Sequence, residues 1–230
     1  MLTELTYNNV DYVFKTDPDD PSGYGCIREI ILNDEYELFR FRNYSKSIFD
    51  IGANCGVATT ILAKQNPNAQ IYSFEPFPPT YQLLIENIKL NSISNVKAFN
   101  CAVGKAGRTA VTLHLHPEFS GGNTICSAQG PFEEFHHSPA KSITVPCISL
   151  DEIIQEHAVE RIDLLKIDCE GSEFEILLQS EQLRTGIVRN IVGEFHDLVY
   201  NSEVSEKSDD LLAYCDEHIQ GIKKISVLKL

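Results

Sequence analysis

Apolar residues along this chain follow two patterns: short continuous or alternating runs, and longer stretches with helical spacing. A run such as Ile-Asp-Leu-Leu-Lys-Ile at 162–167 is typical of a buried strand, and spacing such as that at 80–90 is typical of a helix. The two types alternate from residue 47 to residue 230, which predicts an α/β fold with a doubly wound, mostly parallel sheet. The predicted strands are 48–51, 69–75, 96–103, 108–116, 142–146, 161–167, 190–196 and 224–230. The predicted helices are 57–65, 80–90, one that a capping box starts at Ser149, 174–179 and 202–220.

The pattern predicts a single domain over 1–230 with two additions to its core. The first is an N-terminal extension, 1–46, in which 7–14 alternates weakly like a strand and 27–41 fits a helix or a helix-strand mixture. This extension is expected to cap the pocket, to form a dimer surface or to cover a sheet edge. The second is an inserted β/loop segment whose loop, 117–141, is rich in Gly, Ser, Pro and acids. A loop of that length is either a lid that faces the substrate, hinged at Gly121-Gly122, or disordered without substrate. The short strand at the end of the chain predicts a C-terminal strand pair that is short or incomplete.

A glycine-containing turn follows the first core strand and leads directly into a helix. In this geometry the backbone N–H groups at the helix start face a ligand at the carboxyl end of the strand. Gly52 is expected to bring the backbone close to that ligand, and Asp50 to accept hydrogen bonds from the turn or from a cationic ligand group. The alternative is a turn that binds no ligand. The predicted binding residues of the turn are Asp50, Gly52, Ala53, Asn54 and Gly56.

The second predicted strand ends in an acid, Glu75, about 20 residues after the glycine turn. A carboxylate at this place accepts two hydrogen bonds from the adjacent hydroxyls of a ribose. The turn differs from a dinucleotide-binding fingerprint, because Asn54 and Val57 stand where that fingerprint has glycines. The sequence therefore favours a nucleoside ligand that lacks a pyrophosphate.

Acidic residues and a histidine follow two later strands. Asp168 and Glu170 come directly after the most apolar strand, and Glu194 and His196 end the next one. Carboxylates at the carboxyl ends of parallel strands lie where α/β enzymes place their chemistry. Glu173 is instead interpreted as a charge that stabilises the first turn of the following helix.

The formal net charge of −14, from 19 basic and 33 acidic residues, makes binding to nucleic acid or to an anionic membrane improbable on electrostatic grounds. Seven cysteines without a C-x-x-C pair indicate reduced thiols, and with no leader or membrane span visible we expect a cytoplasmic protein. His114 and His116 share a strand face, but no third ligand stands at a recognised spacing, so no metal is assigned.

Four motifs occur in the order seen in one known family. Asp50-Ile-Gly-Ala-Asn-Cys-Gly56, Phe74-Glu-Pro76, Asn100-Cys-Ala-Val-Gly104 and the stretch 163–174 resemble the successive motifs of the FkbM-type S-adenosylmethionine-dependent methyltransferases. The resemblance implies a Rossmann-like class I methyltransferase fold with S-adenosylmethionine as cofactor. It also implies cofactor contacts for Pro76, Asn100, Ala102 and Asp168, in addition to the turn and Glu75. From the sequence alone, Asn100 could equally close a turn.

Members of that family most often methylate a hydroxyl, so the resemblance implies a small-molecule or sugar acceptor. A hydroxyl acceptor benefits from a general base, for which His196 and Asp168 are the candidates, oriented by Glu194 or Glu170. Three alternatives stay open: a nicotinamide-dependent oxidoreductase, a non-catalytic nucleoside-binding or interaction module, and a metal-assisted methyltransferase that uses Asp168 with Glu170 or a histidine. A homodimer is possible, as for many enzymes of this size.

Overall fold

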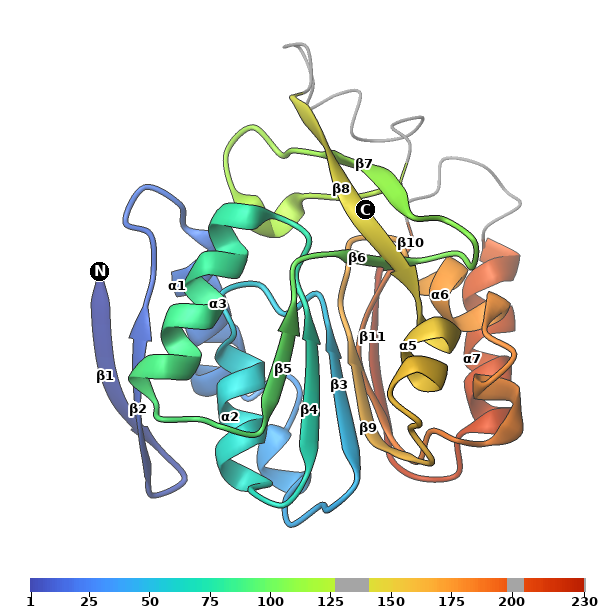
Figure 1. Cartoon of the computed structure of the whole chain (residues 1–230), viewed down its shortest axis with the longest axis horizontal. Coiled ribbons are helices and arrows are strands. Elements are labelled where there is room, and N and C mark those ends of the chain that lie inside the picture. Colours follow the sequence, from blue (N-terminus) through green and yellow to red (C-terminus); the bar gives the residue numbers. More distant parts are fainter. Residues whose placement is uncertain (127–140, 198–204, 230) are drawn as a thin grey trace.

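The computed structural model of the protein describes residues 1–126, 141–197 and 205–229. Its centre is a six-stranded sheet in which every pair of neighbours is parallel, in the order β11-β10-β9-β3-β4-β5 (Figure 1). From β3 the chain winds outward through β4 and β5, then crosses back to β9 and winds the other way, so the winding reverses between β3 and β9. Ligands bind at such a reversal in open α/β sheets. The strands are β3 (Ser47–Ile51), β4 (Gln70–Phe74), β5 (Val96–Phe99), β9 (Ile162–Ile167), β10 (Ile191–Asp197) and β11 (Lys223–Lys229).

Helices cover both faces of this sheet, which confirms the predicted doubly wound fold (Figure 1). Successive side chains of β3 point to opposite faces, so Ile48 joins one apolar cluster and Phe49 the other. The cluster around Phe49 is covered by α5 (Leu150–Glu156), α6 (Glu173–Gln179) and α7 (Ser205–His218). The cluster around Ile48 is covered by α2 (Val57–Gln65), α3 (Pro78–Leu90) and the N-terminal extension. A short 3-10 helix, Leu183–Thr185, leads to β10.

The predicted strand 96–103 is in fact two strands in two different sheets. β5 ends at Phe99, and β6 (Ala102–Gly104) pairs with β8 (Ser142–Ser149), which also pairs with β7 (Ala110–His114). The chain leaves the central sheet at Asn100, whose side-chain amide donates to the backbone carbonyls of Glu75 and Pro76. This three-stranded sheet crosses above the carboxyl ends of the central strands (Figure 1).

The N-terminal extension is a hairpin followed by helical turns, so the predicted single strand over 7–14 is wrong. Asn8 and Asn9 adopt positive φ values of 50° and 63° and turn the chain between two antiparallel strands. The range 27–41 contains only short helical pieces. These elements are β1 (Leu2–Tyr7), β2 (Val10–Lys15), α1 (Ser22–Ile27), a π-helical turn at Arg28–Leu32 and a 3-10 turn at Leu38–Arg40.

The proposed hinge of the loop 117–141 lies in a 3-10 helix, Ser120–Gly122, that is tied to the extension. The amide of Gly121 donates to the Ser22 hydroxyl at 2.7 Å, and the amide of Ser120 donates to the Asp20 carboxylate. Most of this loop, 127–140, lies outside the described residues, so the lid stays a prediction. The capping box at Ser149 is confirmed, and within the described part of the chain β11 pairs with β10 alone. None of the helices described here is both long enough and apolar enough to cross a membrane.

Candidate active site

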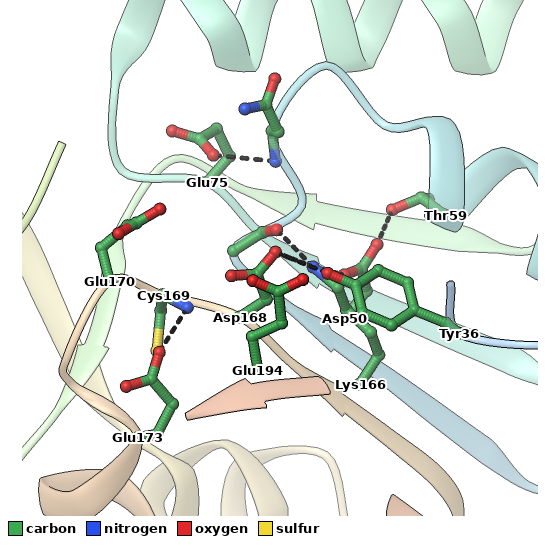
Figure 2. A network of polar contacts seen from close by, with 12 residues as sticks. Tyr36, Asp50, Thr59, Glu75, Lys166, Asp168, Cys169, Glu170, Glu173 and Glu194 are labelled. Carbon is green, nitrogen blue, oxygen red and sulfur yellow. Dashed lines mark hydrogen bonds and ion pairs between the residues drawn. The ribbon is translucent and has the colours of Figure 1, made fainter. Parts of the chain in front are cut away.

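The predicted site residues gather where the carboxyl ends of β3, β4, β9 and β10 meet. In Figure 2, Glu75 lies apart from a group in which Asp168, Asp50 and Lys166 are close together. Parallel pairing brings these strand ends to one edge of the sheet, which explains why residues more than a hundred positions apart in sequence become neighbours.

Gly52 is required by the residue that follows the neighbouring strand, a reason that adds to its predicted role beside a ligand. Its φ is +77°, and a Cβ at this position would lie 1.7 Å from the carbonyl oxygen of Asp168. Gly56 has a φ of +85°, and a Cβ there would lie 2.4 Å from Leu84 Cδ1. Both glycines therefore let the turn pack tightly between β9 and α3. Ala53 is buried in the same turn, and its amide donates to the carbonyl of Phe74.

Asp50 forms a buried ion pair within the chain. Its carboxylate is 0% exposed and lies 3.3 Å from Lys166 Nζ, itself 3% exposed, on the neighbouring strand. Thr59 Oγ1 donates to the other carboxylate oxygen. Lys166 Nζ also donates to the carbonyl of Gly52 at 2.7 Å. Burial alone would lower the pKa of Lys166, but Asp50 and Asp168 outweigh it and hold that pKa above its usual value. Asp50 thus supports the turn through Lys166, and its contact with the cofactor stays a prediction.

Glu75 is held rigidly at the end of β4. One carboxylate oxygen accepts the amide of Asn54 at 2.9 Å, and the other accepts the amide of Phe77 at 2.8 Å. Asn100 fixes the backbone at Glu75 and Pro76, and Ala102 is buried at the start of β6. Burial raises the pKa of Glu75 to about 7, although these two amides act in the opposite direction. A carboxylate oxygen can accept a second hydrogen bond, so this arrangement fits a sugar diol that brings two hydroxyl donors.

Asp168 lies at the carboxyl end of β9 and is oriented from the N-terminal extension. The hydroxyl of Tyr36 donates to Asp168 Oδ2 at 2.8 Å, and Lys166 Nζ lies 3.7 Å from the same oxygen. Burial, and then the Asp168 carboxylate, raise the pKa of Tyr36 well above its usual value, so the hydroxyl keeps its proton. The extension therefore reaches the site, as the capping prediction requires.

His196 stands among four carboxylates. Its Nδ1 lies 3.1 Å from Glu173 Oε1, while its Nε2 lies 3.5 Å from Glu170, 3.6 Å from Glu194 and 4.0 Å from Asp168. Asp168, Glu170 and Glu194 thus converge with His196 as predicted, and Glu173 joins them, which the sequence did not predict.

The role of His196 as a general base does not fit its surroundings. Burial alone would lower the pKa of the imidazole, but the hydrogen bond to Glu173 and the carboxylate of Glu170 outweigh it and raise that pKa to about 10. A ring that already carries its proton near neutral pH is a poor proton acceptor. Burial also raises the pKa of Glu170 to about 7 and that of Glu194 to about 8, with Asp168 adding to both.

Three functional residues escaped the sequence reasoning: Lys166, Tyr36 and Glu173. Lys166 left a signal, because it is the one cation in the mostly apolar run 162–167, and the register places it beside Asp50. Glu173 does lie in the first turn of α6, but it is fully buried, accepts the amides of Cys169 and Gly171, and reaches His196. Tyr36 left no signal in its local sequence.

His114 and His116, for which the sequence assigned no metal, are not part of a group of three or more metal-ligating residues within the described part of the chain. His114 pairs with Thr124 through the backbone, and the ring of His116 lies 3.9 Å from that of Phe119. His136 and His137 lie outside the described residues. All seven cysteines are free, as expected of reduced thiols.

A parallel, doubly wound sheet with a tight glycine turn and a buried carboxylate at its reversal point defines an α/β enzyme that binds a nucleoside-containing cofactor. The chain belongs to the FkbM methyltransferase family: the profile of the methyltransferase FkbM domain matches residues 50–222. The methyl donor of this family is S-adenosylmethionine.

Individual relatives support this assignment. Methyltransferase sdnD of Sordaria araneosa is 31% identical over 189 residues, which cover 73% of this chain and 72% of that protein. Hexuronic acid methyltransferase AglP of Haloferax volcanii is 26% identical, covering 56% of this chain and 48% of that protein. The 2-O-methyltransferase NoeI of Sinorhizobium fredii is 26% identical, covering 65% of this chain and 63% of that protein.

Proposed function

We propose that this methyltransferase transfers the methyl group of S-adenosylmethionine to a hydroxyl oxygen of a small molecule or sugar. Support for an oxygen acceptor comes from relatives named for hexuronic acid methylation and for 2-O-methylation. One observation carries the proposal. Glu75, a carboxylate suited to bind a sugar diol, lies at the same sheet edge as the carboxylates of Asp168, Glu170 and Glu194, which are called here the acidic group around Asp168. The family match favours this reading over a nicotinamide-dependent oxidoreductase or a non-catalytic module.

The residues present fit the cofactor. Glu75 would hold the ribose hydroxyls, and the turn from Gly52 to Gly56 would lie under the cofactor. The negative charge of the carboxylates in the site suits the positive charge of the cofactor's sulfonium. When bound, S-adenosylmethionine supplies a methyl group that its sulfonium has already activated. The protein then contributes alignment and the exclusion of water.

The acidic group around Asp168 orients the acceptor hydroxyl and receives its proton as the new carbon–oxygen bond forms. Asp168 and Glu194 reach this place from neighbouring strands, and Tyr36 keeps Asp168 in a fixed orientation.

The direct test is a screen of hydroxyl-bearing acceptors with isotope-labelled S-adenosylmethionine. The expected product carries the label on an ether oxygen, identified by mass spectrometry and NMR. Transfer to nitrogen or carbon would refute the oxygen acceptor while leaving the methyltransferase assignment intact.

Replacing Glu75 by alanine is expected to weaken the binding of S-adenosylmethionine by about 1–3 kcal/mol, because the ribose loses charge-assisted hydrogen bonds. Titration calorimetry measures this, with S-adenosylhomocysteine as a second ligand and NAD as a ligand that should not bind. Glu160→Ala removes an 81%-exposed carboxylate and serves as the control. Equal affinities for wild type and Glu75→Ala would discard the ribose assignment.

Cofactor affinity is expected to fall as the pH drops below about 7. The free protein raises the pKa of Glu75 to about 7, and the ribose hydroxyls favour its ionised form, so binding must expel a proton at lower pH. Affinity therefore rises with pH up to that value and levels off above it, with a slope that approaches tenfold per pH unit on the acidic side. Calorimetry over this pH range measures the affinity of wild type and of Glu75→Gln for the cofactor. The comparison of the two proteins removes the contribution from titration of the ligand itself. An unchanged slope in Glu75→Gln would contradict the prediction.

A further inference from the structure

Three carboxylates from two segments surround His196 Nε2: Asp168 and Glu170 come directly after β9, and Glu194 lies in β10. The nearest oxygens of Glu170, Glu194 and Asp168 lie 3.5, 3.6 and 4.0 Å from this nitrogen. None of these three contacts is a hydrogen bond, although the imidazole is only 3% exposed. Atoms bound to one octahedral ion at about 2.1 Å lie about 3–4 Å from one another, and the three nitrogen–oxygen distances here fall in that range.

The other ring nitrogen of His196, Nδ1, is held in place by Glu173. Glu173 is fully buried, and its two oxygens accept the amides of Cys169 and Gly171, so its carboxylate is fixed where Nδ1 meets it at 3.1 Å. A carboxylate that binds one imidazole nitrogen, so that the other points at an ion, is the usual support of a metal-binding histidine. Asp168, Glu173 and His196 each offer a ligand atom, and these atoms lie within 4.8 Å of one another.

Asp168 is oriented in the same manner. Tyr36 donates to its Oδ2, and Lys166 lies on that side too, which leaves Oδ1 as the oxygen that faces Nε2. Lys166 is already engaged by Asp50 and by the Gly52 carbonyl. Four carboxylates around one imidazole therefore leave an excess of negative charge that a cation would neutralise.

We propose that Asp168, Glu170, Glu194 and His196 bind one divalent cation, with Glu173 and Tyr36 as the groups that orient two of these ligands. Three carboxylate oxygens and one imidazole nitrogen suit Mn²⁺ or Mg²⁺ better than a thiolate-seeking ion. This revises the expectation from sequence, which assigned no metal and kept metal assistance as an alternative. If the proposed O-methylation is also correct, the ion lies at the acceptor side of the site and lowers the pKa of the hydroxyl.

A competing occupant is an ammonium group of the acceptor itself. An ammonium group would be attracted by the same negative charge. It could only donate a hydrogen bond to the lone pair of the histidine nitrogen held by Glu173, whereas a metal ion would form a coordinate bond with it. The burial of the imidazole also distinguishes the two occupants, because a bare ion reaches the 3%-exposed ring more easily than a substituted amine does.

The experiment uses the full-length protein after removal of ions with a chelator. Mn²⁺ is titrated in, and the loss of the free-ion signal is followed by electron paramagnetic resonance. Wild type is expected to bind one ion. His196→Gln, Asp168→Asn and Glu194→Gln are each expected to lose affinity by tenfold or more, and Glu173→Gln by roughly 10–100-fold through the orientation of the histidine. Glu160→Gln, on the far surface, should bind like wild type.

Binding of S-adenosylmethionine is measured in parallel by calorimetry, with and without Mn²⁺. Wild-type protein that binds the cofactor but no Mn²⁺ would overturn the metal site and leave the methyltransferase function standing. Mn²⁺ binding without cofactor binding would support the metal site and count against the proposed reaction. Mn²⁺ affinity that is unchanged in all four site variants, each checked for native circular dichroism, would also overturn the site.

Discussion

Lys166→Met is expected to destabilise the protein by about 3–5 kcal/mol, the usual effect of leaving one partner of a buried ion pair uncompensated. Asp50 would then be a charge at 0% exposure whose remaining side-chain donor, among the described residues, is Thr59. The Gly52 carbonyl would also lose its donor. Because the free energy of unfolding of a domain is only about 5–15 kcal/mol, this loss should lower the urea concentration at the unfolding midpoint substantially.

Equilibrium unfolding in urea measures the effect. The double variant Asp50→Asn/Lys166→Met removes both charges and should recover a large part of the loss, so it stays measurable even where the single variant fails to fold. Lys46→Met is the matched control, because that lysine forms an exposed pair with Glu160 and should change stability by less than about 1 kcal/mol. A single variant as stable as the control would show that the buried pair contributes little.

Asp168→Asn is expected to lower the rate of methyl transfer by about 10²- to 10⁴-fold. Asparagine keeps the shape of the side chain and still accepts the hydroxyl of Tyr36, so the fold and the cofactor side should be preserved. What is lost is the negative charge that faces the acceptor, whether it receives the proton directly or holds a cation. Steady-state kinetics with an acceptor from the screen gives the rate, and calorimetry gives the affinity for S-adenosylmethionine.

The control for this variant is Asp216→Asn, the same substitution at a side chain that is 74% exposed. It should leave the rate unchanged. A rate for Asp168→Asn within tenfold of wild type would remove Asp168 from the chemistry. Weakened cofactor affinity with a normal maximal rate would instead assign Asp168 to cofactor binding, as the family resemblance implies.

Features that depend on local sequence were predictable. The glycine turn, the acid at the end of β4 and the run at 162–167 each follow from residues a few positions apart, and the structure has all three. The capping box at Ser149 is another case, since both hydrogen bonds lie within one helical turn.

Features that depend on distant contacts were not predictable. The departure of the chain from the sheet at Asn100 is fixed by carbonyls 24 and 25 positions earlier, so apolar alternation alone extended the strand too far. Tyr36 meets Asp168 across 132 positions, and Glu173 meets His196 across 23. The reason for Gly52 was also invisible, because the atom that excludes a Cβ belongs to another strand.

The hydroxyl of Tyr36 has a consequence for how acceptor choice can vary among relatives. Because this side chain comes from outside the sheet, we expect exchange of residues 1–46 to change the proposed acceptor side more than Glu75, which is held by amides of the core. Chimeras joined before β3 are thus a practical way to change what the enzyme modifies, provided that a tyrosine remains to steady the acid at the end of β9.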